Sequence, residues 1–495
     1  MIEGVSNYQD IKQFILDIEN KYPVDQWLYN DIHFWPHIRV QLYYALIHSL
    51  KKKDVKAPYD NISKKESKSK LDKLIQLWNS YLHYNRFFKS IAPRALLFMS
   101  LDMHKVKHEG VYFNRFFDSM ISANELENDS FTFEIKRSPL PCYNQAAVEK
   151  VSPYLEFHYK KYKLLKVFNA IKNQQAHFVE ELDQLKQFLI KNGFNKIAEQ
   201  LTESKLDVWS TKIRVYANFY KQYLIKAKTK KVIAVSYYGF DSMWSCMFAA
   251  NQLEVLTVDF QHGPQTEVHM AYASWTKVPK TGYSIMPREY WCWDQESAKE
   301  INTWSIPIAA IAKVYGQPWL AYLQNKQQQE QSEEKESVIL YTLQTFPLFT
   351  LENTFTPEII KLIKKSIYKW VLRLHPSNAL DAPLIEYYLN KRDVEKGTYN
   401  IQSPIDNPLP EVLTDSILHI TNYSGCTIEA RELGVKTVLI DSVGLEVFQS
   451  YIDQDQVIYQ DKKEPGFYRA LEKIINTTVK NNFFKTKEIP NPTLF

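Results

Sequence analysis

The sequence predicts an α/β protein with two domains, each built on a parallel sheet. The chain has 495 residues, which is too long for one ordinary core. Short apolar strand-like runs alternate with helical patterns in two separate blocks, and this alternation is typical of parallel sheets with right-handed crossovers. A Gln/Glu/Lys tract with no apolar residue, 324–337, lies between the blocks and is interpreted as a linker.

These patterns predict the following organisation. Residues 1–90 form an N-terminal helical extension, and 91–323 form the first α/β domain, which contains a helical insert at 151–228. After the linker, 338–495 form the second α/β domain. Because ligands of such folds bind beyond the carboxyl ends of parallel strands, residues that directly follow a strand are the candidates for chemistry.

The individual elements are predicted from periodicity and turn signals. Apolar runs predict strands at 95–100, 131–135, 232–237, 255–260, 290–293, 338–342, 370–374, 417–420 and 437–440. Helical patterns are expected at 112–122, 242–252, 357–366, 384–391 and 427–433.

Composition restricts the function classes. Hydrophobic residues make up 45% of the chain and charged residues 24%, as in folded globular proteins. The net charge is +5 without a domain-wide basic stripe, so we expect no nucleic-acid partner. The four cysteines are widely spaced and are interpreted as reduced thiols of a cytoplasmic protein: Cys142, Cys246, Cys292 and Cys426.

The N-terminus lacks a charged-then-apolar signal pattern, and no window of about 18 apolar residues is present. We therefore expect a cytoplasmic protein without a membrane span. The Lys-rich stretch 51–70 is interpreted either as a patch drawn to the inner face of the plasma membrane or as a solvated loop.

Two groups of residues in the second domain predict an anion site. His375, preceded by Arg373 and followed by Pro376, comes at the end of the predicted strand 370–374, where an imidazole can meet a phosphate. A second turn, with small hydroxyl residues and a glycine, leads from strand 417–420 into a helix whose first N–H groups are unpaired. The residues of this turn that we expect to hold the nucleotide are Ser424, Gly425, Thr427 and Glu429. The alternative is an ordinary helix cap with an acidic first turn.

Two groups in the first domain are candidates for acid–base chemistry. His262 follows strand 255–260, between Gln261 and Gly263, and could act as a base or bind a hydroxyl. Glu109, beside His108, lies in the loop after strand 95–100 and could deprotonate an acceptor hydroxyl. The alternatives are a backbone-bonded histidine and a solvated polar loop.

Other chemistries lack their patterns. The chain contains no Walker or dinucleotide fingerprint, no HExxH, no paired CxxC and no GxSxG. We therefore expect no bound cofactor and no metal.

The order of these motifs resembles that of the GT-B glycosyltransferases that assemble bacterial capsule and teichoic acid. The motifs are Gln261-His262-Gly263, His375-Pro376, and Ser424-Gly425 followed by Glu429-Ala430 and Gly434. Capsular Kdo transferases and bacterial polysialyltransferases share an HP motif and a later Ser-Ser/Thr motif, and both contact the phosphate of a CMP-sugar. Here the later motif is Ser-Gly, and the acidic-acidic-Gly motif of polysialyltransferases is matched only by His108-Glu109-Gly110.

The resemblance implies two Rossmann-like domains in the GT-B architecture. It implies a glycosyltransferase that moves a sugar from a nucleotide-sugar donor, a CMP-sugar or a UDP-sugar, to a surface polysaccharide or a lipid-linked glycan. Teichoic-acid polymerases carry an HG motif whose His is the base, so His262 competes with Glu109 for this role. The alternatives are a CDP-polyol phosphotransferase, a nucleotide-sugar 2-epimerase and a non-catalytic scaffold of glycan assembly.

Overall fold

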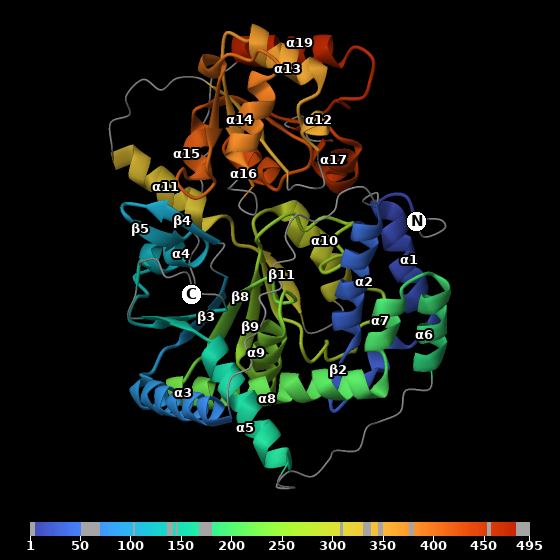
Figure 1. Cartoon of the computed structure of the whole chain (residues 1–495), viewed down its shortest axis with the longest axis vertical. Coiled ribbons are helices and arrows are strands. Elements are labelled where there is room, and N and C mark those ends of the chain that lie inside the picture. Colours follow the sequence, from blue (N-terminus) through green and yellow to red (C-terminus); the bar gives the residue numbers. More distant parts are fainter. Residues whose placement is uncertain are drawn as a thin grey trace. The chain divides into compact units, whose positions relative to one another are not determined.

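The computed structural model divides into two compact units (Figure 1). Unit 1 comprises Met1–Asp102, Glu125–Pro139 and Asn144–Tyr315, and unit 2 comprises Met103–Asn124, Leu140–Tyr143 and Gly316–Phe495. The structure describes residues 5–50, 70–101, 104–135, 142–144, 147–167, 181–306, 310–329, 338–344, 350–375, 381–452 and 457–481.

Unit 1 is built on a parallel sheet of seven strands in the order β11-β10-β9-β8-β3-β6-β7. The strands are β3 (Leu96–Ser100), β6 (Ser130–Glu134), β7 (Val148–Lys150), β8 (Lys231–Val235), β9 (Leu256–Phe260), β10 (Glu289–Cys292) and β11 (Ile311–Val314). The chain starts in the middle at β3, proceeds outward to β7, and returns to the other side of β3 with β8. This reversal makes the β3/β8 boundary the topological switch point, where α/β sheets bind ligands.

The helices of unit 1 come from the predicted extension, the predicted insert and the strand connections. The extension forms α1 (Tyr8–Lys21), α2 (Trp35–Leu50) and α3 (Lys70–Ser90), with a small hairpin of β1 (Leu28–Tyr29) and β2 (Ile32–His33). The insert forms α5 (Ser152–Val167), α6 (Leu182–Lys191), α7 (Asn195–Gln200) and α8 (Glu203–Ala227). The remaining connections are α9 (Asp241–Gln252) and α10 (Gln295–Ser305). Helices α1 and α2 contribute buried side chains to the same apolar core as the sheet, so the extension is an integral part of unit 1.

Unit 2 has a parallel sheet of six strands in the order β14-β13-β12-β15-β16-β17. The strands are β12 (Val338–Thr342), β13 (Lys369–Arg373), β14 (Tyr399–Gln402), β15 (Ser416–Thr421), β16 (Thr437–Leu439) and β17 (Val457–Tyr459). Its switch point lies between β12 and β15. The predicted fold class is confirmed: two parallel α/β sheets form two Rossmann-like domains, with a helical extension and a helical insert.

The helices of unit 2 follow its strands closely, except for two that precede the sheet. They are α4 (Phe117–Ala123), α11 (Pro318–Gln329), α12 (Leu351–Thr354), α13 (Pro357–Lys365), α14 (Ala382–Asn390), α15 (Leu409–Thr414), α16 (Cys426–Glu432), α17 (Ser442–Val447), α18 (Gln449–Ile452) and α19 (Phe467–Asn481). Helix α11 covers the first residues of the predicted linker 324–337, which is therefore helical up to Gln329.

The helix predicted at 112–122 is wrong in its first part. Residues of β4 (Lys105–His108) and β5 (Val111–Asn114) form an antiparallel hairpin instead, and only α4 is helical. The reason lies at Asn114, whose side-chain oxygen accepts the backbone N–H groups of Phe116 and Phe117. This local turn separates strand from helix and competes with a continuous helix. The hairpin and α4 belong to unit 2 by their contacts, although the sequence patterns placed them in the first domain.

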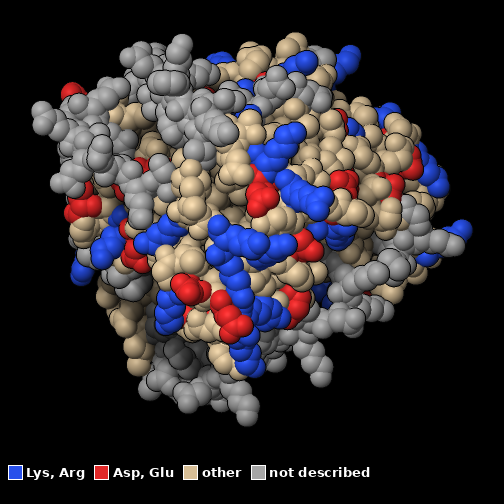
Figure 2. Space-filling model, turned by 90° about the horizontal axis from the view of Figure 1, so that it is seen from above, with Lys and Arg blue, Asp and Glu red and all other residues tan. Residues whose placement is uncertain are grey.

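The face of unit 2 formed around α13 and α19 carries charges of both signs. Figure 2, which views the molecule from above, shows Lys and Arg side chains interspersed with Asp and Glu side chains. A hollow of about 680 Å³ on this face is lined by Lys361, Lys463 and Arg469 together with Glu358 and Glu464. This face therefore has no single sign of charge.

Candidate functional site

The carboxyl ends of β13 and β15 in unit 2 hold a cluster of buried cationic and hydroxyl groups. Arg373 is the last residue of β13, and Thr427 lies in the first turn of α16, directly after β15. Arg115 reaches the same place from the turn between β5 and α4. Arg115 and Arg373 are electrostatic neighbours of each other and of Glu429. The three side chains thus meet from separate parts of the chain.

Arg115, Arg373 and Thr427 each have a donor atom that is buried and has no hydrogen-bond partner in the described part of the chain. The atoms are Nε of Arg115, Nη1 of Arg373 and Oγ1 of Thr427. The other terminal nitrogen of Arg373, Nη2, donates to the carbonyl oxygens of Asn407 (2.7 Å) and Pro404 (3.3 Å), which fixes the direction of the guanidinium. Two guanidinium groups with donors directed to no protein acceptor can bind an acceptor such as phosphate at this strand end.

The ionisation of the cluster is set by burial. Burial lowers the pKa of the Arg373 guanidinium to about 10, so that it remains protonated at neutral pH. Burial lowers the pKa of the His375 imidazole below its ordinary value, and the positive charge of Arg115 lowers it further. Burial raises the pKa of the Glu429 carboxyl, while Arg115 and Arg373 oppose this rise. A bound anion would reverse the effect on His375 and favour its protonated, donating form.

The turn after β15 is organised by its own hydroxyl groups. The backbone N–H of Ser424 donates to Oγ1 of Thr421 (3.2 Å), and Oγ of Ser424 accepts the N–H of Cys426 (3.3 Å). These bonds order the turn before α16, whose N-cap is Gly425 and has no side-chain cap hydrogen bond. Gly425 has φ −57°, which any residue adopts. Pro376 lies outside the described residues.

At the switch point of unit 2, Gln344 follows β12 and faces the end of β15. Its Nε2 lies 3.5 Å from Oγ1 of Thr421. Lys462 follows β17 and donates to Oδ1 of Asn422, which follows β15 (2.7 Å). It also forms an ion pair with Asp441, which follows β16 (3.2 Å). The sequence patterns did not single out Arg115, Gln344 or Lys462. Strand-end position could have indicated Gln344, whereas nothing local indicates Arg115.

A pocket of about 930 Å³ lies at the switch point of unit 1. Residues that follow three sheet strands line it: Leu101 after β3, Ser236 and Tyr238 after β8, and His262 after β9. Helix α2 supplies the opposite wall with polar and aromatic side chains, which are His37, Gln41, Tyr44 and His48. The pocket therefore combines hydrogen-bonding groups with aromatic surface, as small-molecule sites do.

His262 and Ser236 are hydrogen-bonding neighbours in this pocket. The Ser236 hydroxyl lies 2.8 Å from Nε2 and 3.3 Å from Nδ1 of His262. Ser236 has φ +60°, an uncommon conformation for a residue with a side chain. Such strain is found preferentially at functional sites, where surrounding structure maintains it. Ser236 was not singled out from the sequence because it fell inside the predicted strand 232–237, whereas β8 ends at Val235.

The turn at Ser236 is held by a buried carboxylate. Oδ1 of Asp259 accepts the N–H of Tyr237 (2.9 Å), and Oδ2 accepts the hydroxyl of Tyr272 (2.8 Å). Burial raises the pKa of Asp259 to about 7, and these two hydrogen bonds oppose the rise. Asp259 thereby links β9 to the turn that follows β8 and fixes Ser236 beside His262.

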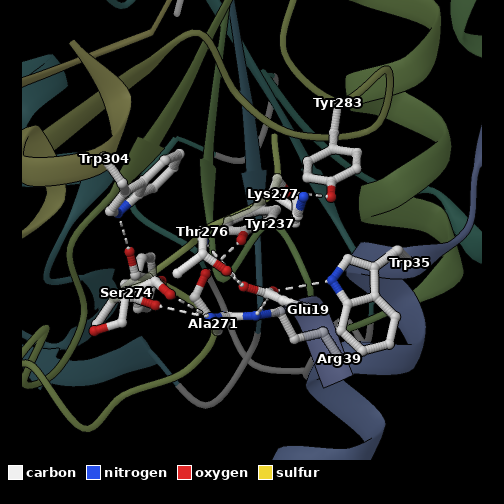
Figure 3. Close-up of polar contacts among 12 residues, drawn as sticks. Glu19, Trp35, Arg39, Tyr237, Ala271, Ser274, Thr276, Lys277, Tyr283 and Trp304 are labelled. Carbon is white, nitrogen blue, oxygen red and sulfur yellow. Dashed lines mark hydrogen bonds and ion pairs between the residues drawn. The ribbon is translucent and has the colours of Figure 1, made fainter. Parts of the chain in front are cut away.

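Helix α2 is fixed to unit 1 by a buried ion pair (Figure 3). Nε of Arg39 lies 2.7 Å from Oε1 of Glu19, and both side chains are completely buried. Arg39 also donates to the carbonyl oxygens of Ala273 and Ser274, and Glu19 accepts from Trp35 and from both the N–H and the hydroxyl of Thr276. The wall that α2 gives to the pocket is therefore anchored to segment 271–276, which also carries Tyr272.

The other predicted residues of the first domain have visible structural roles. The Gln261 side chain donates to Gly263 and Ser297 and accepts the N–H of Trp293, so it connects the ends of β9 and β10. His108 packs edge-on against the rings of Phe113, Trp319 and Tyr322.

Glu109 and Gly110 form the two-residue turn between β4 and β5. Their φ angles are 48° and 78°, and two consecutive positive φ angles are what a type I′ hairpin turn requires. The turn accounts for a glycine at position 110. It places Glu109 at an exposed hairpin tip in unit 2, whereas His262 lies in unit 1.

In the described part of the chain, no group of three or more His, Cys, Asp or Glu side chains could hold a metal ion. No helix there is long and apolar enough to cross a membrane.

The comparisons with known proteins concern the fold. No family model and no curated protein matches the chain. Among solved structures, MnaA of S. aureus in a co-structure with UDP is 11% identical, with a TM-score of 0.44 over 81% of this chain and 92% of that one. UDP-GlcNAc 2-epimerase of Neisseria meningitidis, bound to UDP-GlcNAc, is 14% identical, with a TM-score of 0.41 over 80% and 95%. The wall teichoic acid polymerase TagF is 10% identical, with a TM-score of 0.36 over 83% and 99%.

Proposed function

We propose that the chain is a glycosyltransferase whose unit 2 binds the phosphates of a nucleotide-sugar donor. The observation that carries this proposal is the pair of Arg115 and Arg373, which are electrostatic neighbours at a strand end and each have a buried donor atom without a partner in the described part of the chain. Thr427, in the first turn of α16, has a third such donor. Two guanidinium groups match the charge and the fork geometry of a diphosphate or phosphate. In transfer, the bond between sugar and phosphate breaks and leaves negative charge on the phosphate, which these cations stabilise.

The acceptor hydroxyl is proposed to bind in the pocket of unit 1. His262 removes its proton, and the acceptor oxygen then bonds to the anomeric carbon of the donor sugar. Ser236 orients the imidazole through the 2.8 Å contact at Nε2. His262 is favoured over Glu109 as base because it lies in a pocket with aromatic walls, whereas Glu109 lies at an exposed hairpin tip. His375 and Glu429 complete the donor site, His375 as a phosphate donor and Glu429 as a counter-charge to the two arginines.

The test measures nucleotide affinity, which depends on unit 2 alone. Calorimetric titration of the full chain with CMP, CDP, UDP, GDP and dTDP should show binding of one of them. Arg115→Gln should weaken that affinity about 10- to 100-fold, since a hydrogen bond to a charged group contributes roughly 1.5–3 kcal/mol. Arg392→Gln is the matched control, because both arginines of unit 2 lie over an aromatic ring: Arg115 is 4.8 Å from the centroid of Phe116, and Arg392 is 3.5 Å from that of Tyr388. It should leave the affinity unchanged.

Absence of binding by all five nucleotides would overturn the donor site and favour the non-catalytic scaffold. Equal losses in Arg115→Gln and Arg392→Gln would show that the cluster is not the phosphate site. If a nucleotide binds as expected, product analysis separates the reactions: a polyol phosphotransferase adds phosphate to the product, and an epimerase acts without an acceptor.

A further inference from the structure

Helices α3 and α5 of unit 1 form an antiparallel pair, and several of their large apolar side chains are exposed to solvent. Tyr84 and Phe87 of α3 stack on Phe157 and Tyr154 of α5, at 5.2 and 4.5 Å between ring centroids. Because the higher-numbered residue of α3 meets the lower-numbered residue of α5, the two helices run in opposite directions. The start of α3 therefore lies toward the end of α5.

Helix α3 is apolar on two opposite faces. Tyr84, Phe87 and Phe88 pack against the core of unit 1. About half a turn around the helix, the spacing i, i+3, i+7 places Ile75, Trp78 and Leu82 on one stripe, and these side chains are 51%, 60% and 47% exposed. A helix on the surface of a protein normally turns polar residues to water, so a second apolar face indicates a second apolar environment.

Helix α5 extends the same surface. Leu164 and Leu165 follow Phe157 and His158 by seven residues, so they continue the stripe of α5 that packs on α3. They are 49% and 38% exposed. Together with Tyr81, the two helices hold six of the nineteen large hydrophobic side chains that are exposed in the described residues.

The charge of the two helices is strongly positive. Their sequences contain eight Lys or Arg and two Asp or Glu, a formal +6, although the whole chain carries only +5. Among the lysines, Lys161, Lys163 and Lys166 are exposed on α5 beside Leu164 and Leu165. Helices that bind the headgroup region of an anionic bilayer typically have aliphatic side chains on one face. Tryptophan, tyrosine and lysine flank this face.

We propose that the surface of α3 and α5 formed by Ile75, Trp78, Tyr81, Leu82, Leu164 and Leu165 docks onto an anionic lipid membrane. The apolar stripe enters the headgroup boundary, and the flanking lysines bind lipid phosphates. Docking of this kind needs no membrane-spanning helix, and it does not depend on which reaction the protein performs.

The test is co-sedimentation of the full chain with vesicles of phosphatidylcholine alone or mixed with phosphatidylglycerol. We expect binding to the mixed vesicles only. Trp78→Ser should lower the association constant for the mixed vesicles about 10-fold or more. The double variant with Lys161→Gln and Lys166→Gln should bind the mixed vesicles more weakly, and its binding should depend less on salt concentration. Because these side chains are exposed, the melting temperature should stay at the wild-type value.

Matched controls lie on unit 2. Tyr387→Ser removes a side chain that is 58% exposed on α14, and Lys364→Gln with Lys365→Gln removes two exposed lysines of the mixed-charge face. Neither should change vesicle binding. The proposal is overturned if the mixed vesicles are not bound, or if the controls lose as much binding as Trp78→Ser. It is also overturned if the chain forms a dimer without lipid that Trp78→Ser dissociates, since a second copy would then cover the surface.

Discussion

Replacing Arg39 by leucine tests how firmly the N-terminal helices belong to unit 1. The Glu19–Arg39 pair is completely buried, with 2.7 Å between Nε and Oε1. Leucine removes the guanidinium and leaves the carboxylate of Glu19 with its hydrogen-bond donors from Trp35 and Thr276 but without a counter-charge. The backbone carbonyls of segment 271–276 that Arg39 contacts also lose their donor.

The expected cost follows from this burial. Removing one partner of a buried ion pair costs about 3–5 kcal/mol, whereas an exposed pair contributes about 0–1 kcal/mol. At roughly 2–4 °C per kcal/mol for a unit of this size, the melting temperature of unit 1 should fall by about 10 °C. Replacing both residues, Glu19→Gln with Arg39→Met, should recover much of this loss, since no uncompensated charge remains.

Thermal unfolding of the full chain, followed by tryptophan fluorescence, measures this effect, because nine of the eleven tryptophans belong to unit 1. The control is Lys313→Gln, which breaks the exposed ion pair with Glu289 in the same unit. If Arg39→Leu lowers the transition no more than Lys313→Gln does, the buried pair does not fasten α2 to unit 1, and the account of the pocket wall is wrong.

Two further predictions concern catalysis and pH. His262→Ala should lower kcat about 100-fold or more in a transfer assay, as expected for loss of a general base, whereas Glu109→Gln should leave kcat near the wild-type value; the opposite ranking would assign the base to Glu109. Ser236→Ala should lower kcat less than His262→Ala does, because it disturbs only the orientation of the imidazole. Burial lowers the pKa of His419 to about 3, while it hydrogen-bonds to Thr342 and Thr437 in the unit 2 sheet. Below about pH 6.5 the unfolded chain binds a proton at His419 and the folded chain does not. The free energy of unfolding of unit 2 should therefore fall by about 1.4 kcal/mol per pH unit because of this residue between pH 6.5 and about 3. Calorimetry of His419→Gln should show a smaller decrease with falling pH than the wild type.

The fold could be predicted because its signals are local. Each buried strand of a parallel sheet reads as an apolar run, and the nine strands expected from such runs all exist. The strands that were not predicted are short or partly polar: β7 and β14 have mixed sequences, and β17 has only three residues. The hairpin β4–β5 was not predicted because its Glu-Gly turn lacks the Asn-Gly or Asp-Gly pair typical of a two-residue hairpin turn.

The candidate site could be predicted only where a residue follows a strand. His262 and His375 were found in this way, and the structure places both after strands, His262 in a pocket and His375 beside Arg115. Ser236 was missed because a positive φ angle is usually indicated by glycine or asparagine, and serine gives no such indication. The helical extension was not expected to contribute to a site, because its contact with the strand ends depends on the long-range Glu19–Arg39 pair.

Arg115 shows why part of the donor site lies beyond sequence patterns, and its position leads to a final prediction. The hairpin that precedes Arg115 is held to unit 2 by the buried cluster of Val106, Phe113, Trp319 and Leu323, and the N–H of Lys107 donates to the carbonyl of Ile405 (2.8 Å). Phe113→Ala removes the central ring of this cluster, a change that costs roughly 3–5 kcal/mol in a packed core. Arg115 should then lose its fixed position, and nucleotide affinity should fall toward that of Arg115→Gln.

The double variant separates positioning from general damage. If Phe113 acts through Arg115, the variant with Phe113→Ala and Arg115→Gln should bind nucleotide no more weakly than Arg115→Gln alone, because the two changes remove the same interaction. Phe355→Ala is the control, since this ring is equally buried in unit 2 but belongs to a different cluster; measured below its melting temperature, it should retain affinity. Additive losses for Phe113→Ala and Arg115→Gln would mean that the hairpin contributes to the donor site independently of Arg115.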